Sequence, residues 1–406
     1  MDDGRSRLFV PIRAERFRDQ SRLSDVIAPP YDVLSPAGRA ELAARSSHNI
    51  VHLTLPVGRP DPYAAAAAVL ARWREEAALV REAAPCVYVV QQDFLTPDGR
   101  RYVRTGVVGG LGAEGYDAGR VRPHERTHGG PKEDRYALGQ ATHCAPEPIF
   151  ALVRDGHGHL QRRLEGVTKH EPTAVGDFDG GAVGIWRVRG AQAEEIVHAV
   201  GDGPLYIADG HHRYETASAL RTAVPGADRI PALVVPAADP GVIVLPTHRL
   251  IRGGTVARGD LLESWRRDYD VEDRETELDP KGLLDALGPR PAAVVVFPDG
   301  RMVSVVSRAD RAEDLEIAVI ERDIIQPAAV GGTVEYTASP AELLDTVTCH
   351  GATGVLVRPT PVSQVLAVAD RGATMPPKST YFVPKVPSGL LILPFDEASH
   401  SDEGQP

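Results

Sequence analysis

The chain is organised around one stretch, Leu205 to Ala217, which reads LYIADGHHRYETA. Its first four residues are an apolar run typical of a buried strand. Asp209-Gly210 is a turn signal, because glycine adopts backbone conformations that other residues avoid. From His211 onward, apolar residues recur at helical spacing. The stretch therefore predicts a strand, a tight turn and a helix in succession, within a mixed α/β fold.

The predicted turn is a candidate site for an anion. The first N–H groups of a helix have no partner within the helix, and the helix dipole favours negative charge there. Arg213 can add a bidentate contact to a phosphate, and Asp209 stands where a carboxylate can hold Mg²⁺ or accept a proton. The alternative interpretation is purely structural: Asp209 caps the helix, and His211 and His212 are ordinary polar residues beside it.

The order strand, DGHHR turn, helix, strand resembles the fold shared by ParB proteins, sulfiredoxins and free serine kinases. The resemblance implies a nucleotide, ATP or ADP, whose phosphates are held by the turn residues Gly210, His211, His212 and Arg213. Sulfiredoxins need a reactive cysteine where this chain has His211, so their chemistry is not expected here.

Further motifs run from near the start of the chain to residue 390. They identify the chain as a member of a large bacterial family of unknown function. The motifs are APPYDVLSP (Ala28–Pro36), NIVHLTLP (Asn49–Pro56), HERTHGGPKEDRYAL (His124–Leu138), ADGHHRYETA, LPTHRLI (Leu245–Ile251) and MPPKSTYFVPKVPSGL (Met375–Leu390). The family carries no agreed activity, so the resemblance indicates kinship rather than function.

A chain of 406 residues is expected to form two or three domains. The predicted arrangement is a ParB/sulfiredoxin-like nucleotide-binding unit with an α/β insertion and a C-terminal α/β domain. The expected boundaries are 1–55 plus 175–252 for the ParB-like unit, 56–174 for the insertion, 253–395 for the C-terminal domain and 396–406 for a disordered tail. Apolar runs at 8–12 and 230–235 are the expected sheet partners of the strand at 205–208.

Local signals predict several other elements. Ser35-Pro36 opens a helix, with serine at the cap and proline in the first turn. Residues 61–83 predict a long helix capped by Asp61. Residues 85–94 and 102–110 alternate in the manner of strands and are joined by a turn at Pro97-Asp98-Gly99.

The net charge of −11, from 45 basic and 56 acidic residues, argues against non-specific binding to DNA or to membranes. The sequence has no long apolar run and its start has no apolar signal region, so a cytoplasmic protein is expected. Cys86, Cys144 and Cys349 are few and scattered, which predicts reduced, buried thiols.

The segment His124 to Arg135 is the most polar of the chain. A solvated charged surface is the usual meaning of such a run. Here, however, both charge signs alternate with histidines around a Gly-Gly pair, and phosphoryl transfer needs both cations and carboxylates. The candidate catalytic residues are Asp209, His211, Glu125 and Asp32; candidate substrate or phosphate contacts are Tyr31, His124, Lys132, Arg135, His248, Arg249, Lys378, Ser379 and Thr380; candidate Mg²⁺ ligands are Asp209 and Glu133.

These residues lead to the hypothesis of a nucleotide-dependent kinase acting on a small hydroxylated metabolite, with serine or a related hydroxy amino acid expected from the resemblance. The alternative is a ParB-like nucleotide-binding switch, or a nuclease, acting with DNA or a protein partner. The kinase hypothesis places Tyr31-Asp32, His124–Arg135, Asp209–Arg213 and Lys378–Lys385 in one cleft. It also expects Asp209→Asn and Glu125→Gln to abolish turnover and to leave the thermal midpoint nearly unchanged.

Overall fold

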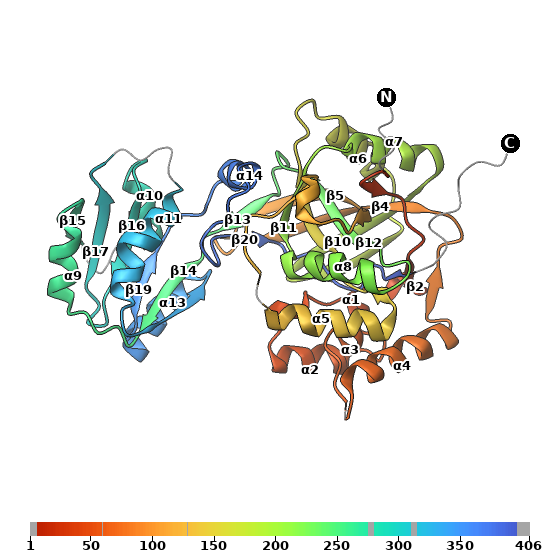
Figure 1. The fold of residues 1–406 in the computed structure, drawn as a ribbon, viewed down its shortest axis with the longest axis horizontal. Coiled ribbons are helices and arrows are strands. Elements are labelled where there is room, and N and C mark those ends of the chain that lie inside the picture. Colours follow the sequence, from red (N-terminus) through yellow and green to blue (C-terminus); the bar gives the residue numbers. More distant parts are fainter. Residues whose placement is uncertain (1–5, 59, 128, 275–279, 310–314, 396–406) are drawn as a thin grey trace. The chain divides into compact units, whose positions relative to one another are not determined.

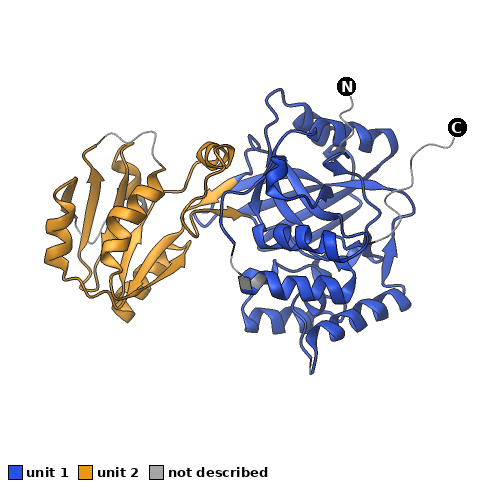
Figure 2. Ribbon diagram, in the orientation of Figure 1, with its two compact units in different colours: residues 1–242, 384–406 blue, residues 243–383 orange. Residues whose placement is uncertain are grey.

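The computed structural model describes residues 6–395 apart from 59, 128, 275–279 and 310–314. It divides into two compact units, which are described separately (Figure 2). Unit 1 comprises residues 1–242 and 384–406, and unit 2 comprises residues 243–383. The predicted mixed α/β class is confirmed. The predicted tail at 396–406 lies outside the described residues.

Unit 1 is built on a mixed sheet of nine strands among the residues described. The main path runs in the order β6 (Val121–Arg122), β11 (Leu205–Asp209), β8 (Ile149–Val153), β12 (Arg229–Pro236), β5 (Arg101–Gly112), β4 (Cys86–Leu95), β10 (Gly181–Arg189) and β9 (Ala174–Phe178). The ninth strand, β1 (Phe9–Val10), pairs with β5. This close approach requires glycine at position 109, where a Cβ atom would lie 2.6 Å from the Phe9 ring.

Strand β11 was predicted, but the strands expected to pair with it are wrong. It pairs with β8 on one side and with β6 on the other, while β12 lies one strand further away and β1 further still. Strand β8 reads IFALV and is buried along its whole length. A strand covered on both faces shows no polar–apolar alternation, so the sequence pattern gives little sign of it.

The predicted helix caps are confirmed. The Ser35 side chain accepts a hydrogen bond from the N–H of Gly38 at the start of α2 (Pro36–Arg45). The Asp61 side chain accepts two backbone N–H groups at the start of α4 (Pro62–Glu75). Helix α4 ends earlier than predicted, because Ala77 takes a positive φ of 52° and the chain continues into the short strand β3 (Leu79–Arg81).

Helices cover both faces of the sheet (Figure 1). On one side lie α6 (His159–Thr168) and α7 (Gly190–Val200), which bury Leu160, Leu164, Ile196 and Val200. On the other side α8 (His211–Ala223) packs beside α5 (Gly129–Thr142), and α5 packs against α4. The short helices α1 (Leu23–Val26) and α3 (Val51–Thr54) complete this layer.

The division into units differs from the expected domains. Strands β4, β5 and β8, expected in a separate insertion at 56–174, form the middle of the same sheet as β11 and β12. A continuous hydrogen-bonded ladder cannot be cut into two cores, so 6–242 forms one unit. The chain also returns to unit 1 after residue 383: β21 (Leu393–Pro394) pairs with β7 (Cys144–Ala145), and Ser388 bridges to Ala28.

Unit 2 is a smaller α/β unit. Its six-stranded sheet, counted over the described residues, has the order β15 (Tyr269–Arg274), β17 (Met302–Ser307), β16 (Ala292–Val296), β19 (Thr353–Leu356), β14 (His248–Arg252) and β18 (Thr333–Thr337). A separate pair joins β13 (Ile243–Leu245) to β20 (Tyr381–Val383). The helices are α9 (Arg258–Trp265), α10 (Pro280–Ala286), α11 (Glu316–Ile320), α12 (Gln326–Ala328), α13 (Pro340–His350) and α14 (Val362–Asp370), with a π-helical turn at Glu321–Ile325 between α11 and α12.

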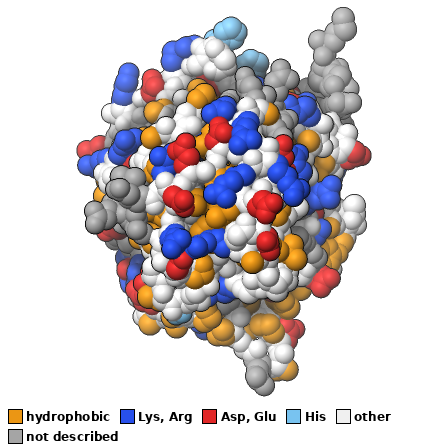
Figure 3. Space-filling view, turned by 90° about the vertical axis from the view of Figure 1, so that its left-hand side faces the viewer, with side chains coloured by type: hydrophobic (Ala, Val, Ile, Leu, Met, Phe, Trp, Pro, Cys, Tyr) orange, Lys and Arg blue, Asp and Glu red, His pale blue; other side chains and the backbone are white. Residues whose placement is uncertain are grey.

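The face shown in Figure 3 carries basic and acidic side chains interspersed with one another. Unit 2 carries surface ion pairs, such as that of Arg308 with Asp270 at 2.9 Å.

Among the described helices, none combines the length and the apolar character needed to cross a membrane. All three cysteines are free, but only Cys86 and Cys144 are buried; Cys349 is exposed on α13, which corrects the expectation of three buried thiols.

Candidate functional site

The turn between β11 and α8 has the predicted form. Gly210 takes φ 94° and ψ 30°, a left-handed conformation that favours glycine. A Cβ atom at this position would also lie 2.9 Å from the Ile149 side chain. No side chain caps the N-terminus of α8, so the alternative in which Asp209 is the helix cap is wrong. The first amides of this helix therefore form the type of site that binds anions.

Asp209 is the centre of a buried ionic network. One of its oxygens lies 2.5 Å from the Lys385 ammonium, and the other lies 2.6 Å from a guanidinium nitrogen of Arg213. Burial opposes ionisation of this carboxyl, but the two neighbouring cations outweigh it and hold the pKa of Asp209 below its usual range. Asp209 is therefore an anion at neutral pH, with both oxygens in use.

The donor set around Asp209 does not fit a Mg²⁺ ion. Two cationic side chains occupy the carboxylate oxygens, and a divalent cation would have to displace and repel both. Glu133, the other expected ligand, is an exposed residue of α5. Over the described part of the chain, no group of three or more His, Cys, Asp or Glu side chains is arranged to hold a metal ion.

Arg213 is placed differently from the expectation. Its side chain is only 5% exposed, and it donates to the Pro148 carbonyl as well as to Asp209. The guanidinium thus holds β11 and the segment before β8 together beneath the turn. Helical periodicity at the start of α8 does not reveal that this position faces inward.

Two histidines lie together behind the turn. The rings of His124 and His211 meet edge to face, with centroids 4.7 Å apart, and both residues are buried. The His124 backbone N–H donates to Nε2 of His211 at 3.4 Å, and Nδ1 of His124 is 2.8 Å from the Ile207 carbonyl. Burial lowers the pKa of His124 to about 4, and burial together with His124 lowers the pKa of His211 well below its usual value. Both rings are therefore neutral at pH 7 and offer a lone pair rather than a charge.

A second buried network joins the APPYDV segment to helix α5. Arg135 pairs with Glu147 at 3.1 Å and lies over the Tyr31 ring, with its central carbon 4.1 Å from the ring centroid. Glu147 also accepts from the Tyr31 N–H and from the Ser388 hydroxyl. Burial raises the pKa of Tyr31 to about 12, so its phenol is neutral. Asp32 is exposed beside this network and interacts electrostatically with Arg213.

The polar segment before α5 contacts α8. Lys132 pairs with Glu215 at 2.9 Å, and the Thr127 hydroxyl donates to the same carboxylate. Glu125 is partly buried next to His124 in the chain. A cavity of about 300 Å³ adjoins this region. Its lining includes Arg39, Tyr63, Asp134 and Arg135, together with apolar residues of the 34–36 and 55–57 segments.

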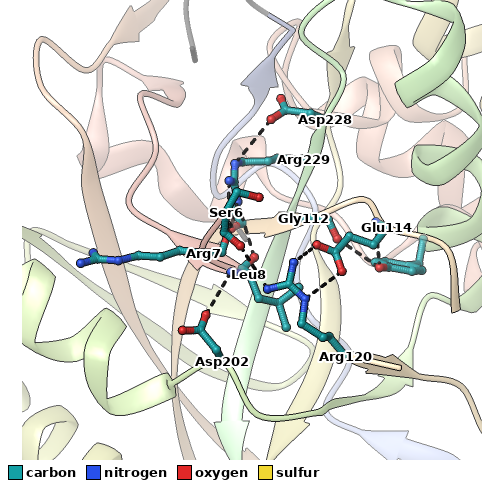
Figure 4. A network of polar contacts seen from close by, with 11 residues as sticks. Ser6, Arg7, Leu8, Gly112, Glu114, Arg120, Asp202, Asp228 and Arg229 are labelled. Carbon is teal, nitrogen blue, oxygen red and sulfur yellow. Dashed lines mark hydrogen bonds and ion pairs between the residues drawn. The ribbon is translucent and has the colours of Figure 1, made fainter. Parts of the chain in front are cut away.

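The polar contacts drawn in Figure 4 include those of Gly112 and Glu114 at the end of β5. The Tyr214 hydroxyl donates to the Gly112 carbonyl and accepts from the Glu114 N–H. Glu114 pairs with Arg120, which in turn donates to the Ser6 carbonyl. The contacts of Tyr214 hold α8 against the end of β5, so the turn at the start of α8 has a fixed position.

The structure brings together three of the four segments expected in one cleft. Tyr31-Asp32, His124–Arg135 and Asp209–Arg213 all belong to unit 1, and Lys385 joins them from the fourth. The remaining candidates, His248, Arg249, Lys378, Ser379 and Thr380, belong to unit 2. His248 accepts the Val357 N–H, and Arg249 pairs with Glu321 at 3.4 Å.

Two residues of the unit 1 site, Lys385 and Glu147, were not predicted from the sequence as individual candidates. Lys385 lay within a predicted segment, where the proline-rich pattern gave no reason to prefer it to Lys378. Glu147 stands between two prolines, in the motif-free segment APEPIF, just before the buried strand β8. A charged residue at the mouth of such a strand is the signal that was available.

A family model described as "Protein of unknown function (DUF1015)" matches residues 9–328. The chain belongs to this family. The predicted membership is thus confirmed, and the match spans most of unit 1 together with much of unit 2.

No curated protein matches this DUF1015 chain. Among solved structures it is similar to a conserved hypothetical protein from Pyrococcus furiosus, with 15% identity and a TM-score of 0.38, covering 70% of this chain and 93% of that one. It is also similar to a free serine kinase variant in complex with ADP, with 13% identity and a TM-score of 0.39, covering 71% and 88%. A third is C-terminally truncated SbnI from Staphylococcus aureus, with 12% identity and a TM-score of 0.39, covering 69% and 85%.

Proposed function

We propose that unit 1 binds ATP or ADP and transfers a phosphoryl group to a small hydroxylated metabolite, serine or a related hydroxy amino acid. One observation carries the proposal: the left-handed Gly210 turn leaves the start of α8 without a side-chain cap, next to the Lys385 ammonium. Backbone N–H groups, the helix dipole and a fixed cation together favour a phosphate at this point.

In the proposed reaction the substrate hydroxyl oxygen forms a bond to the terminal phosphorus of the nucleotide. The bond from that phosphorus to the bridging oxygen breaks, and the shortened nucleotide leaves with the electron pair. The hydroxyl proton passes to a base on the protein. The protein's part is to position the two reactants and to balance the charge on the phosphoryl oxygens.

The charges of the site narrow the choice of base. Both oxygens of Asp209 contact cations, so Asp209 is a poor proton acceptor. Its role in this proposal is to hold Lys385 and Arg213 in place. Asp32 is exposed beside Arg213, and Glu125 follows the buried His124. We assign the proton-accepting role to one of these two carboxylates, since a base must reach the hydroxyl within hydrogen-bonding distance.

The proposal is tested by incubating the full chain with ATP or ADP, Mg²⁺ and a set of hydroxylated compounds that includes L-serine, L-threonine and glycerate. Phosphorus NMR should show a new phosphomonoester and the matching shortened nucleotide in equal amounts. Conversion of nucleotide to free phosphate, at the same rate with and without these compounds, would contradict transfer. A lack of nucleotide binding at millimolar concentration would contradict the whole proposal.

A further inference from the structure

Arg104, on strand β5, is a buried cation that forms no ion pair with any residue the structure describes. Its side chain is among the largest fully buried ones, with 1% exposure. One terminal nitrogen donates to the Gln92 side chain at 2.5 Å, and the guanidinium lies 4.4 Å above the centre of the Phe150 ring. Its other two nitrogens, Nε and Nη1, are buried and have no hydrogen-bond partner among the residues described.

Arg104 differs from the other buried arginines of the described residues in having no ion pair. Arg135 pairs with Glu147, Arg213 with Asp209, and Arg249 with Glu321, each within 3.4 Å. Burying a guanidinium without such a partner is costly, because both its charge and its N–H groups lose their hydration. Burial accordingly lowers the pKa of Arg104 to about 9, against the opposing influence of Asp239 and Asp209.

Neither of those carboxylates neutralises Arg104 directly. Asp239 accepts the backbone N–H groups of Gly241 at 2.8 Å and Thr105 at 3.4 Å. Asp209 is already shared between Lys385 and Arg213. Among the described residues, Arg104 therefore keeps a positive charge without an ion-pair partner and two donors without an acceptor.

This charge lies beside the proposed phosphate site. Gln92, the hydrogen-bond partner of Arg104, also donates to the Lys385 carbonyl at 2.9 Å. The Lys385 ammonium contacts Asp209, and Asp209 is the register partner of Phe150 on the neighbouring strand. Arg104 is thus linked through Gln92 and Lys385 to the turn at the start of α8. Solvent reaches this network at Asp209 and Lys385, whose side chains are 18% and 12% exposed.

We propose that Arg104 binds the carboxylate of the phosphoryl acceptor, so that the substrate is a hydroxy acid or hydroxy amino acid and not a neutral alcohol or sugar. A carboxylate brings one negative charge and acceptor oxygens, which matches the unpaired charge of Arg104 and its two unused donors. A phosphate group in place of the carboxylate would instead carry about 1.5 to 2 negative charges. This inference rests on the proposed function and names the part of the substrate that the site recognises.

The test uses pairs of probes that differ in the carboxylate: L-serine against ethanolamine, and glycerate against glycerol. Binding to the full chain in the presence of ADP is measured by calorimetry for the wild type and for Arg104→Gln. The inference predicts that at least one carboxylate probe binds more tightly than its partner, and that Arg104→Gln weakens this binding about ten- to hundred-fold. It is overturned if no carboxylate probe is preferred, or if the preference survives in Arg104→Gln.

The stability of the unliganded protein gives a second readout that needs no ligand. If Arg104 is kept for binding, Arg104→Met should leave the thermal midpoint unchanged or raise it, because an unbalanced buried charge is removed. Arg135→Met is the matched control: it leaves Glu147 buried without its partner and should lower the midpoint clearly. A similar large loss in Arg104→Met would show a structural role and contradict the inference.

The two proposals fail in different ways. If the wild type does not bind ADP, the proposed function is wrong. If ADP binds equally to the wild type and to Arg104→Gln while no carboxylate probe is preferred, the nucleotide site stands and only the role of Arg104 is wrong.

Discussion

The substitution Asp209→Asn should strongly destabilise unit 1. Asp209, Lys385 and Arg213 have side chains that are 18%, 12% and 5% exposed, so the asparagine would leave two largely buried cations without the carboxylate that they share. Breaking a buried ion pair in this way costs about 3–5 kcal/mol, which corresponds to roughly 6–20 °C in the midpoint of a unit of this size. The expectation of an unchanged midpoint, drawn from the sequence alone, is thereby revised.

The assay is urea unfolding followed by tryptophan fluorescence in a Trp265→Phe background, because the remaining tryptophans, Trp73 and Trp186, both belong to unit 1. The double variant Asp209→Asn with Lys385→Met should be less destabilised than the sum of the single variants by about 1–3 kcal/mol. The surface ion pair of Arg7 with Glu194 supplies the control: Glu194→Gln should change stability little.

A stabilising role of the Asp209 contacts would be refuted if Asp209→Asn lowered the free energy of unfolding by less than about 1 kcal/mol. Additive effects in the double variant would refute it as well. Either result would mean that the Asp209 contacts do not stabilise the turn.

Three further outcomes are expected. The contribution of His124 to the free energy of unfolding should fall by about 3 kcal/mol as the pH drops from 6.5 to 4, because the unfolded chain binds a proton that the buried ring does not. His124→Asn should therefore make this part of a urea-unfolding pH series less steep. Gly210→Ala should lower the free energy of unfolding by about 1–3 kcal/mol, measured by urea unfolding, because the left-handed φ and the nearby Ile149 side chain both disfavour a Cβ atom. Either Asp32→Asn or Glu125→Gln should reduce turnover about 10²–10⁴-fold with an unchanged midpoint, and normal turnover in both variants would refute the assignment of the base.

Much of unit 1 could be predicted from local signals. The caps at Ser35 and Asp61 and the turn at Gly210 depend only on neighbouring residues in the chain, so the residue types at these positions are enough to predict them. The position of β8 between β11 and β12 could not be predicted, because a strand buried on both faces has no alternating pattern.

The candidate site was predicted only in part, for a related reason. The sequence indicates which residues are polar but not which way they face. Arg213 was expected to contact a phosphate, yet its side chain is buried and pairs with Asp209. Lys385 lies 176 residues beyond Asp209, and no local pattern links a loop lysine to a carboxylate so distant in the chain.

One titration can show whether the start of α8 binds a nucleotide phosphate. ADP is titrated into the wild type, His212→Glu and Ala219→Glu. A glutamate in the first turn favours the helix itself, but like charges about 6 Å apart at an effective dielectric constant of about 20 repel by roughly 3 kcal/mol. Ala219 is exposed two turns further along the same helix and supplies the same charge at a distance.

We expect His212→Glu to weaken ADP binding at least about ten-fold without lowering the thermal midpoint, and Ala219→Glu to bind ADP like the wild type. Equal affinity of His212→Glu and the wild type for ADP would contradict this expectation.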